Sequence, residues 1–249
     1  MGGFHFFLAI LGLVLLPTLC TSQDTFTRSR ATYYGSPDCY GTPTGACGYG
    51  EYGRTVNDGQ VSAVARLYRN GTGCGGCYQV RCTYPSHCSN DGVNAVVTDY
   101  GEGDRTDFIF SPRAYAKLAN NPASTEVLFD YGVVDIEFRR IPCRYSTPNL
   151  VFKVHEHSKF PEYLAIVVQY VAGRNDITAV EFWQEDCKQW ISMRRAYGAV
   201  WDTPTPPRRS IDMRFQVSGS SGIKWVQASN AIPADWKAGA AYTSAIQLN

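Results

Sequence analysis

The chain has 249 residues, which is enough for one large domain or two small domains with buried cores. Its formal net charge is only +1, and basic residues occur in pairs such as Arg139-Arg140 and Arg208-Arg209. This balance argues against a nucleic-acid-binding protein, which usually shows a concentrated basic excess, so a polymer partner is expected to be uncharged.

The N-terminal segment, residues 1–22, is predicted to be a secretory signal peptide. The apolar run within residues 6–16 is about half as long as a bilayer crossing requires. Small residues at Cys20 and Ser22 fit cleavage before Gln23, although the usual N-terminal Lys or Arg is absent. No later stretch is long and apolar enough to span a membrane. We therefore expect a soluble, secreted, extracellular protein with no membrane partner.

The first half of the chain contains short apolar or alternating runs bounded by Gly, Asn and Asp, which predict β-strands. One helix is predicted after Ser111, because this residue can cap it, Pro112 fits the first turn, and residues 114–119 carry an apolar stripe. The sequon at Asn70 lies in a polar turn and is a candidate N-glycosylation site. The predicted strands are VSAVARLY (61–68), CYQVRC (77–82), VNAVVTDY (93–100) and VVDIEFRRI (133–141).

The cysteines are predicted to form disulfides. Loss of the signal peptide removes Cys20 and leaves eight of the nine cysteines. The cluster of Cys74, Cys77, Cys82 and Cys88 would suggest a zinc site or a redox pair in a cytosolic protein, but an export signal favours disulfides. We therefore predict no metal and no cofactor. The spacing alone does not determine which cysteines pair.

The distribution of cysteines predicts a domain boundary. Seven of the eight remaining cysteines lie before residue 144, and only Cys187 lies after it. We expect a first domain at residues 24–144 and a second at residues 150–249, joined by the short linker Tyr145-Ser-Thr-Pro-Asn149. The second part alternates at period two in LVFKVHEH, EYLAIVVQYVAG, DITAVEFW, QWISMRR and IDMRFQV, which predicts a small β-sandwich.

Several segments resemble plant expansins, in the same order and over nearly the whole mature chain. They are ATYYGSPDCYGTPTGACGYG, GTGCGGCYQVRC, VVTDY, VVDIEFRRIPC and AIPADWKAGAAYTS. The chain is most similar to the expansin-like B branch, because it carries RTDFIFSPRAY where true expansins carry a His-Phe-Asp motif. The resemblance implies an all-β fold: a six-stranded double-psi β-barrel followed by an immunoglobulin-like carbohydrate-binding β-sandwich.

The resemblance also implies a disulfide pattern. Cys39 and Cys187 have no partner in this pattern, so they are either free thiols or bridged to each other across the domains. The implied pairs are Cys47–Cys74, Cys77–Cys143 and Cys82–Cys88.

The first domain further resembles family-45 endoglucanases, which cut β-1,4-glucan with one carboxylic acid and one carboxylate base. Expansins keep the acid, lack the base, and loosen cell walls without hydrolysis. With Ser111 as the anchor of the alignment, the His-Phe-Asp positions fall on Asp107, Phe108 and Ile109. Isoleucine cannot transfer a proton, so we predict a non-hydrolytic protein with no catalytic residue.

The remaining groove residues are carried over from the family. Thr32 and Tyr34 match the family's Thr-x-Tyr, and Asp99 matches the Asp of its VTD motif. These three side chains are expected to hydrogen-bond sugar hydroxyls. Asp107 has the same parity as Ile109 and is expected to face the groove, with a solvated edge position as the alternative.

The second domain is expected to stack glucan rings on exposed aromatic side chains. The family positions are Tyr163 and Tyr197, with Trp201 as a weaker candidate. Tyr163 lies opposite in parity to the apolar residues that follow it, which are expected to fill the core. The other aromatics of this domain are expected to be packing residues, namely Tyr170, Trp183, Trp190, Trp225 and Trp236.

The sequence therefore predicts a secreted, monomeric cell-wall protein that binds cellulose, xyloglucan or another matrix glycan and loosens the wall without hydrolysis. No nucleic-acid partner is expected. Two alternatives remain open. One is a residual β-1,4-glucan hydrolase, and the other is a non-loosening wall or defence protein, since double-psi barrels also occur in barwin-type defence proteins.

Overall fold

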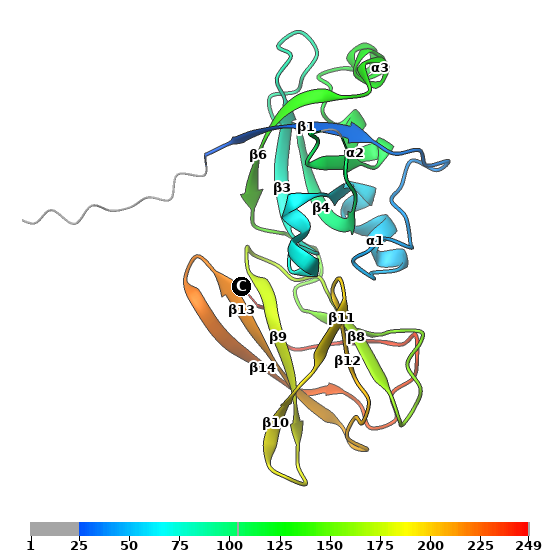
Figure 1. Cartoon of the computed structure of the whole chain (residues 1–249), viewed down its shortest axis with the longest axis vertical. Helices are drawn as coiled ribbons and strands as arrows, with labels where there is room; N and C mark the ends of the chain where they lie inside the picture. Colours follow the sequence, from blue (N-terminus) through cyan, green and yellow to red (C-terminus); the bar gives the residue numbers. More distant parts are fainter. Residues whose placement is uncertain (1–24, 104, 249) are drawn as a thin grey trace, which may run out of the picture.

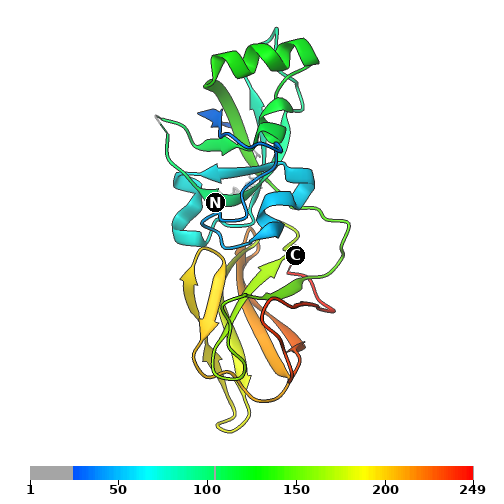
Figure 2. The same ribbon diagram turned by 90° about the vertical axis from the view of Figure 1, so that its right-hand side faces the viewer.

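The three-dimensional structure is a computed structural model that describes residues 25–103 and 105–248. A barrel and a sandwich lie one above the other along the long axis of the molecule (Figures 1 and 2). The predicted signal peptide, residues 1–22, lies outside the described residues.

The N-terminal part forms a closed six-stranded barrel in the order β1-β5-β2-β4-β3-β6, as predicted. The β1-β5 and β2-β4 pairs are parallel, and the other neighbours are antiparallel. Phe108, Phe110 and Tyr115 are fully buried in its core. The strands are β1 (Thr27–Tyr33), β2 (Val61–Val64), β3 (Cys77–Cys82), β4 (Val93–Tyr100), β5 (Phe108–Phe110) and β6 (Val134–Ile141).

The predicted helix is present as α2 (Pro112–Ala116), and the Ser111 hydroxyl accepts a hydrogen bond from the Ala114 amide at 3.1 Å. A longer helix, α3 (Pro122–Tyr131), was not predicted. It has the same signals, because the Asn121 side chain caps it and proline occupies its first turn. Three short helical segments complete this part, namely α1 (Glu51–Thr55), η1 (Val56–Gly59) and η2 (Arg66–Gly71).

The C-terminal part is the predicted β-sandwich. A four-stranded sheet, β10-β9-β13-β14, faces a five-stranded sheet, β11-β12-β8-β7-β15. Phe152, Ile166 and Phe215 fill the core between the sheets. The strands are β7 (Val151–Val154), β8 (Leu164–Gln169), β9 (Asp176–Gln184), β10 (Gln189–Ser192), β11 (Arg194–Tyr197), β12 (Val200–Thr203), β13 (Ile211–Gly219), β14 (Gly222–Ile232) and β15 (Ala241–Thr243).

Strand β8 is buried on both faces. Leu164, Ile166 and Val168 face the sandwich core, whereas Ala165 and Val167 belong to the apolar cluster of the barrel. The barrel therefore packs against the outer face of the five-stranded sheet.

The three disulfides implied by the family resemblance are present. Cys39 and Cys187 are both exposed free thiols, so they do not bridge the two domains. The bonded pairs are Cys47–Cys74, Cys77–Cys143 and Cys82–Cys88.

The two domains meet through direct backbone contact at two glycines. Gly71 and Gly198 have φ values of 89° and 47°, and a Cβ on either residue would overlap backbone atoms of the other domain. Beside them, the Ala199 amide donates to the Cys47 carbonyl at 2.9 Å. Arg195 Nη1 donates to the Gly71 carbonyl at 3.3 Å. Only a residue without a side chain permits this approach.

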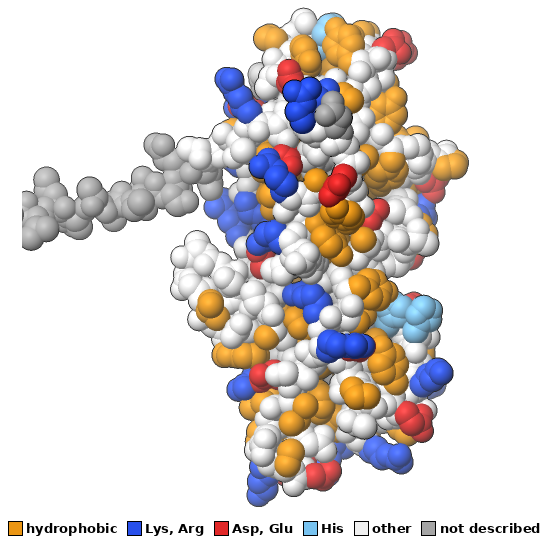
Figure 3. Space-filling view, in the orientation of Figure 1, with side chains coloured by type: hydrophobic (Ala, Val, Ile, Leu, Met, Phe, Trp, Pro, Cys, Tyr) orange, Lys and Arg blue, Asp and Glu red, His pale blue; other side chains and the backbone are white. Residues whose placement is uncertain are grey.

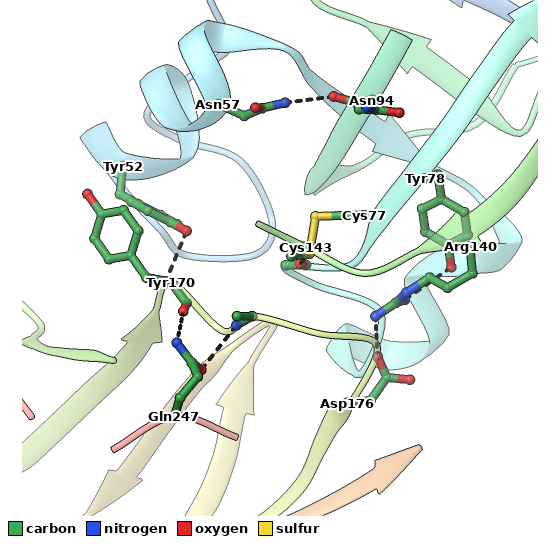
Figure 4. The surroundings of a disulfide bond; sticks show 12 residues. Tyr52, Asn57, Cys77, Tyr78, Asn94, Arg140, Cys143, Tyr170, Asp176 and Gln247 are labelled. Atoms are coloured by element: carbon green, nitrogen blue, oxygen red, sulfur yellow. Dashed lines mark hydrogen bonds and ion pairs between the residues drawn. A yellow bond between two sulfur atoms is a disulfide. The ribbon is translucent and has the colours of Figure 1, made fainter. Parts of the chain in front are cut away.

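Polar contacts reinforce the junction. The Asp176 carboxylate pairs with Arg140 of β6 at 3.0 Å and with Arg69 at 2.8 Å. The Tyr170 amide donates to the Tyr52 hydroxyl at 3.2 Å, as Figure 4 shows. Tyr145, from the predicted linker, packs edge-on against the Tyr170 ring. Tyr170 is therefore structural, as expected, although it serves the domain junction and not the sandwich core.

We expect Gly198→Ala to lower the free energy of unfolding by about 1–3 kcal/mol, because the new Cβ combines left-handed strain with overlap of the Ala46 and Cys47 backbone. Thermal unfolding and X-ray scattering would measure the stability and the arrangement of the domains. Gly222→Ala is the matched control, since Gly222 has φ +94° but no atom within 4 Å of an added Cβ. Equal losses in both variants would show that the close approach adds nothing beyond backbone strain.

Candidate polysaccharide-binding site

One row of side chains crosses four adjacent strands on the outer face of the barrel. Thr32 of β1 pairs with Ile109 of β5. Ile109 pairs with Ala63 of β2, which pairs with Asp99 of β4. A Cβ added at Gly101 would lie 3.0 Å from Ile109 Cδ1 and 3.2 Å from Ala63 Cβ, so these two side chains face the same way. We call Thr32, Ile109, Ala63 and Asp99 the barrel row.

Asp99 links the barrel row to the loop above it. Its Oδ1 accepts hydrogen bonds from the amides of Ala46 and Tyr100 at 2.6 and 2.7 Å. Both bonds fall on Oδ1, so Oδ2 can accept from a further donor. Burial, and to a lesser extent the negative charge of Asp99, raises the pKa of the Tyr34 hydroxyl. That hydroxyl therefore stays protonated and can donate a hydrogen bond next to Asp99.

Thr32 lies at the end of the barrel row opposite Asp99. The Thr32 hydroxyl donates to the Gly132 carbonyl at 2.8 Å and keeps its capacity to accept. Tyr34 lines a shallow hollow of about 360 Å³ together with Asp38 and Arg54. The barrel row and Tyr34 together offer hydroxyl, phenol and carboxylate groups near the apolar Ile109.

Asp107 does not face the groove as an open carboxylate, so this prediction was wrong. The residue is only 6% exposed. Its carboxylate accepts from the Ser29 hydroxyl at 2.6 Å and from Arg66 Nε at 2.8 Å. The Arg66 hydrogen bond is the main reason that the pKa of Asp107 is lowered. Strand alternation with Ile109 does not apply, because Asp107 precedes the short strand β5. Its side chain turns toward partners on β1 and η2.

In the second domain, Tyr197 and Tyr163 lie on the outer face of the five-stranded sheet. Tyr197 is 48% exposed, and its hydroxyl lies 3.0 Å from His155 Nε2. Burial lowers the pKa of His155, which favours the neutral imidazole. Tyr163 is half-buried, and its hydroxyl donates to Asp202 Oδ2 at 2.9 Å.

Asp202 orients Tyr163 from beneath. The carboxylate is 3% exposed and pairs with Arg194 at 2.6 Å. Hydrogen bonds from Arg194 are the main cause of its lowered pKa. Because this carboxylate is held ionised and fully engaged, it fixes the Tyr163 hydroxyl and offers no proton.

Trp201 cannot stack on a glycan, so that weaker candidate was wrong. It is 4% exposed and belongs to the sandwich core. In the antiparallel register Trp201 pairs with Ile166, which faces the core, and alternation places Val200 and Asp202 outward. The guanidinium of Arg195 lies 4.1 Å from the centroid of its ring.

A hollow of about 650 Å³ lies between the loop that Asp99 holds and the outer face of the sandwich, and we call it the junction hollow. Its walls are loop residues between Pro43 and Tyr52 and outer-face residues of the sandwich, including His155 and Tyr197. The Tyr197 ring packs against Gly48, where an added Cβ would lie 2.9 Å from Cε2. Histidine atoms and neighbouring hydrophobic atoms mark this region in Figure 3.

The structure also places aromatic side chains outside the predicted binding positions. Tyr100, directly after Asp99, is 44% exposed and lies beside Tyr68, with ring centroids 5.1 Å apart. Sequence reasoning missed this ring, although its position after the VTD motif was a signal. Trp236 is buried as expected, but Trp225 is 40% exposed and stacks on Arg214.

The remaining predicted features concern modification, metals and membranes. Asn70 is exposed in η2, a position accessible to a glycan. Among the described side chains, no group of three or more His, Cys, Asp or Glu is placed to hold a metal ion. Within residues 25–103 and 105–248, no helix combines the length and the apolar character that crossing a bilayer would require.

Comparisons with known proteins agree with this architecture. The profile described as "Expansin C-terminal domain" matches residues 150–233, and the profile described as "Lytic transglycolase" matches residues 60–138. The chain is 61% identical to "Expansin-like B1" of Arabidopsis thaliana, with 95% of this chain and 94% of the relative covered. It is 43% identical to "Expansin-like B1" of Oryza sativa subsp. japonica, with 96% and 94% covered.

Solved structures show the same fold. A crystal structure of apo expansin from Clavibacter michiganensis superposes with a TM-score of 0.66 at 21% identity, covering 90% of this chain and 98% of that protein. A mutant of that expansin, solved in complex with cellohexaose, gives a TM-score of 0.65. The chain belongs to the expansin superfamily, and within it to the expansin-like B branch.

We expect Asp107→Asn to destabilise the fold by about 1 kcal/mol, since Arg66 is largely exposed and its pairing is screened by solvent. The folded-state pKa of Asp107 lies below its unfolded value, so the stabilisation is present above about pH 4 and is lost as the pH falls further. Urea unfolding at pH 6 and pH 3 should therefore show a smaller pH effect in the variant. If the variant keeps its stability but loses glycan binding, Asp107 contacts the glycan and does not serve mainly to stabilise the fold.

Proposed function

We propose that this chain is a secreted plant cell-wall protein that binds cellulose or a related neutral glucan along a path from the barrel row to Tyr197, and loosens the wall without hydrolysis. The observation that carries the proposal is the continuity of this path. Asp99 holds the loop at Ala46, and Tyr197 packs on Gly48 of the same loop. The cellohexaose bound to a mutant expansin of the same fold supports glucan as the ligand class.

The chemistry of the path suits a neutral polymer. Glucan rings present apolar faces, which stack on exposed aromatic side chains such as Tyr197 and Tyr100. Sugar hydroxyls need donors and acceptors, which Thr32, Tyr34 and Asp99 supply. In this proposal residues 24–144 provide the groove and residues 150–249 provide most of the affinity. The protein acts as a monomer, and Asn70 carries an N-linked glycan.

The non-hydrolytic part of the proposal rests on the count of available carboxylates. Inverting hydrolysis uses an acid and a base about 6.5–9.5 Å apart. The barrel row contains only Asp99 as a carboxylate, and Ile109 lies in the row where the family alignment places the acid. Asp107 is engaged by Arg66 and Ser29 and does not replace it.

We expect Tyr197→Ala to weaken binding to cellulose by about 1–3 kcal/mol, by analogy with base stacking on aromatic side chains. Thermal stability should change little, because nearly half of the Tyr197 side chain is exposed. Depletion isotherms on cellulose would measure the affinity. Tyr131→Ala is the matched control, since Tyr131 is 50% exposed but lies on α3 of the barrel. An equal loss of binding in the control would remove Tyr197 from the proposed path.

The purified protein should release no reducing ends from amorphous cellulose above a heat-inactivated sample. Ile109→Asp would place a protonatable group in the barrel row, separated from Asp99 by Ala63. We expect this variant to gain wall extension as the pH falls toward the range in which an aspartic acid takes up a proton, about pH 4. Ile109→Asn, which carries no titratable proton, should show no gain.

Strong acid-triggered wall extension by the unmodified protein would show that loosening does not require an acid at position 109. Sustained release of reducing ends by the pure protein would contradict the proposal that it is non-hydrolytic.

A further inference from the structure

A second hollow, of about 490 Å³, lies beside the Cys77–Cys143 disulfide. This volume falls within the range of roughly 300–1,000 Å³ that is usual for small-ligand sites. It shares no lining residue with the junction hollow or with the hollow at Tyr34. We call it the basic hollow, because Arg139, Arg144 and Arg174 line it.

The floor of the basic hollow consists of two parallel rows on strands β6, β3 and β4. One row is apolar: Cys77 pairs with Ile141 on one side and with Val96 on the other. Asn94 of β4 pairs with Gln79 of β3, which pairs with Arg139 of β6, and these residues make the second, polar row. Cys77 and Val96 are 6% and 1% exposed, so the half-buried Ile141 is the accessible end of the apolar row. Amides and a guanidinium border it.

The rim is built from the connector and the second domain. Cys143 and Gly173 form an antiparallel backbone bridge, with amide-to-carbonyl distances of 2.8 and 3.0 Å. This bridge brings Arg144 of the connector and Arg174 of the sandwich to the same hollow. Figure 4 shows the Cys77–Cys143 bond at its centre, with Asn57 and Asn94 on the barrel side. A ligand here would contact the barrel, the connector and the sandwich together.

The charged side chains among the residues that line the basic hollow are basic. Its lining residues include three arginines and no Asp or Glu. Arg139 is held in place, because its Nε donates to Gln79 Oε1 at 2.9 Å and its guanidinium lies 4.8 Å from the centroid of the Phe26 ring. Guanidinium groups remain protonated and match carboxylates in a two-pronged geometry. The hollow is therefore suited to an anion that also has an apolar face.

We propose that the basic hollow binds a carboxylated glycan, that is, a stretch of uronic acid residues. The carboxylates would pair with Arg144, Arg174 and Arg139, and one sugar face would lie against Ile141. The amides of Asn57 and Asn94 would contact ring hydroxyls. The choice of a glycan among possible carboxylates rests on the proposed function, which places the protein among wall polysaccharides. The site itself rests on the geometry alone.

Calorimetric titration with tri-galacturonate, with its methyl ester and with cellotriose tests this inference at low and high salt. We expect binding of the free acid, weakened by salt, and much weaker binding of the ester. The double variant Arg144→Gln/Arg174→Gln should lose about tenfold or more in affinity, as expected when charge-assisted hydrogen bonds are removed. The charge-matched control Arg208→Gln/Arg209→Gln, on a sandwich loop beside Glu185 and Asp186, should bind like the parent.

Three results would overturn the inference: equal affinity for the methyl ester, an equal loss in the Arg208/Arg209 control, or full displacement of the trisaccharide by an equal concentration of inorganic phosphate. The last result would show a general anion site. Arg144 is exposed, so Arg144→Gln alone keeps the test valid if the double variant is unstable.

The two proposals fail separately. The variant Arg144→Gln/Arg174→Gln should keep its affinity for cellulose, and Tyr197→Ala should keep its affinity for tri-galacturonate. If the arginine variant also loses cellulose binding, the two ligands share one site, and the inference of a separate basic hollow is wrong.

Discussion

The backbone contact between Gly71 of the barrel and Gly198 of the sandwich is the constraint on which the binding surface depends. No side chain fits between these residues, so the two domains approach more closely here than packed side chains would allow. Tyr197, one residue before Gly198, is thereby held against the barrel loop at Gly48. Asp99 fixes the same loop through the Ala46 amide. A single close approach thus aligns a groove on one domain with an aromatic face on the other.

The charged groups divide into those that hold the fold and those that remain for ligands. Asp176, Asp107 and Asp202 are each paired with arginines, and their carboxylates are mostly buried. Pairing lowers the pKa of Asp107 and of Asp202, so these two carboxylates stay ionised and do not act as general acids. Asp99 differs, because its two backbone hydrogen bonds leave one oxygen open. Asp99 is therefore the one carboxylate of the barrel row, and it keeps an oxygen for a ligand hydroxyl.

The local distribution of charge differs from what the net charge of the chain suggests. A balance of +1 led to the expectation of an uncharged polymer partner, and the barrel row fits that expectation. Arg139, Arg144 and Arg174 nevertheless gather around one hollow. Net charge averages over the surface, whereas a ligand experiences only the groups within a few Debye lengths. A wall protein with both surfaces would be able to hold a neutral and an acidic polysaccharide at once.

The sequence by itself determined features that depend on local chemistry: the alternating runs that form β7, β8, β9, β10 and β13, and the cap of α2 at Ser111. Through the resemblance to expansins it also predicted the barrel and the three disulfides. Its patterns did not predict strands β1, β5, β12, β14 and β15 or helix α3. Only the tertiary structure decided which partners Asp107 contacts and which face of the sheet Trp201 takes. The partners of Asp107 lie 41 and 78 residues away, and the direction of Trp201 follows from its register with β8. Long-range pairing sets which face a side chain takes, and periodicity within one strand does not encode it.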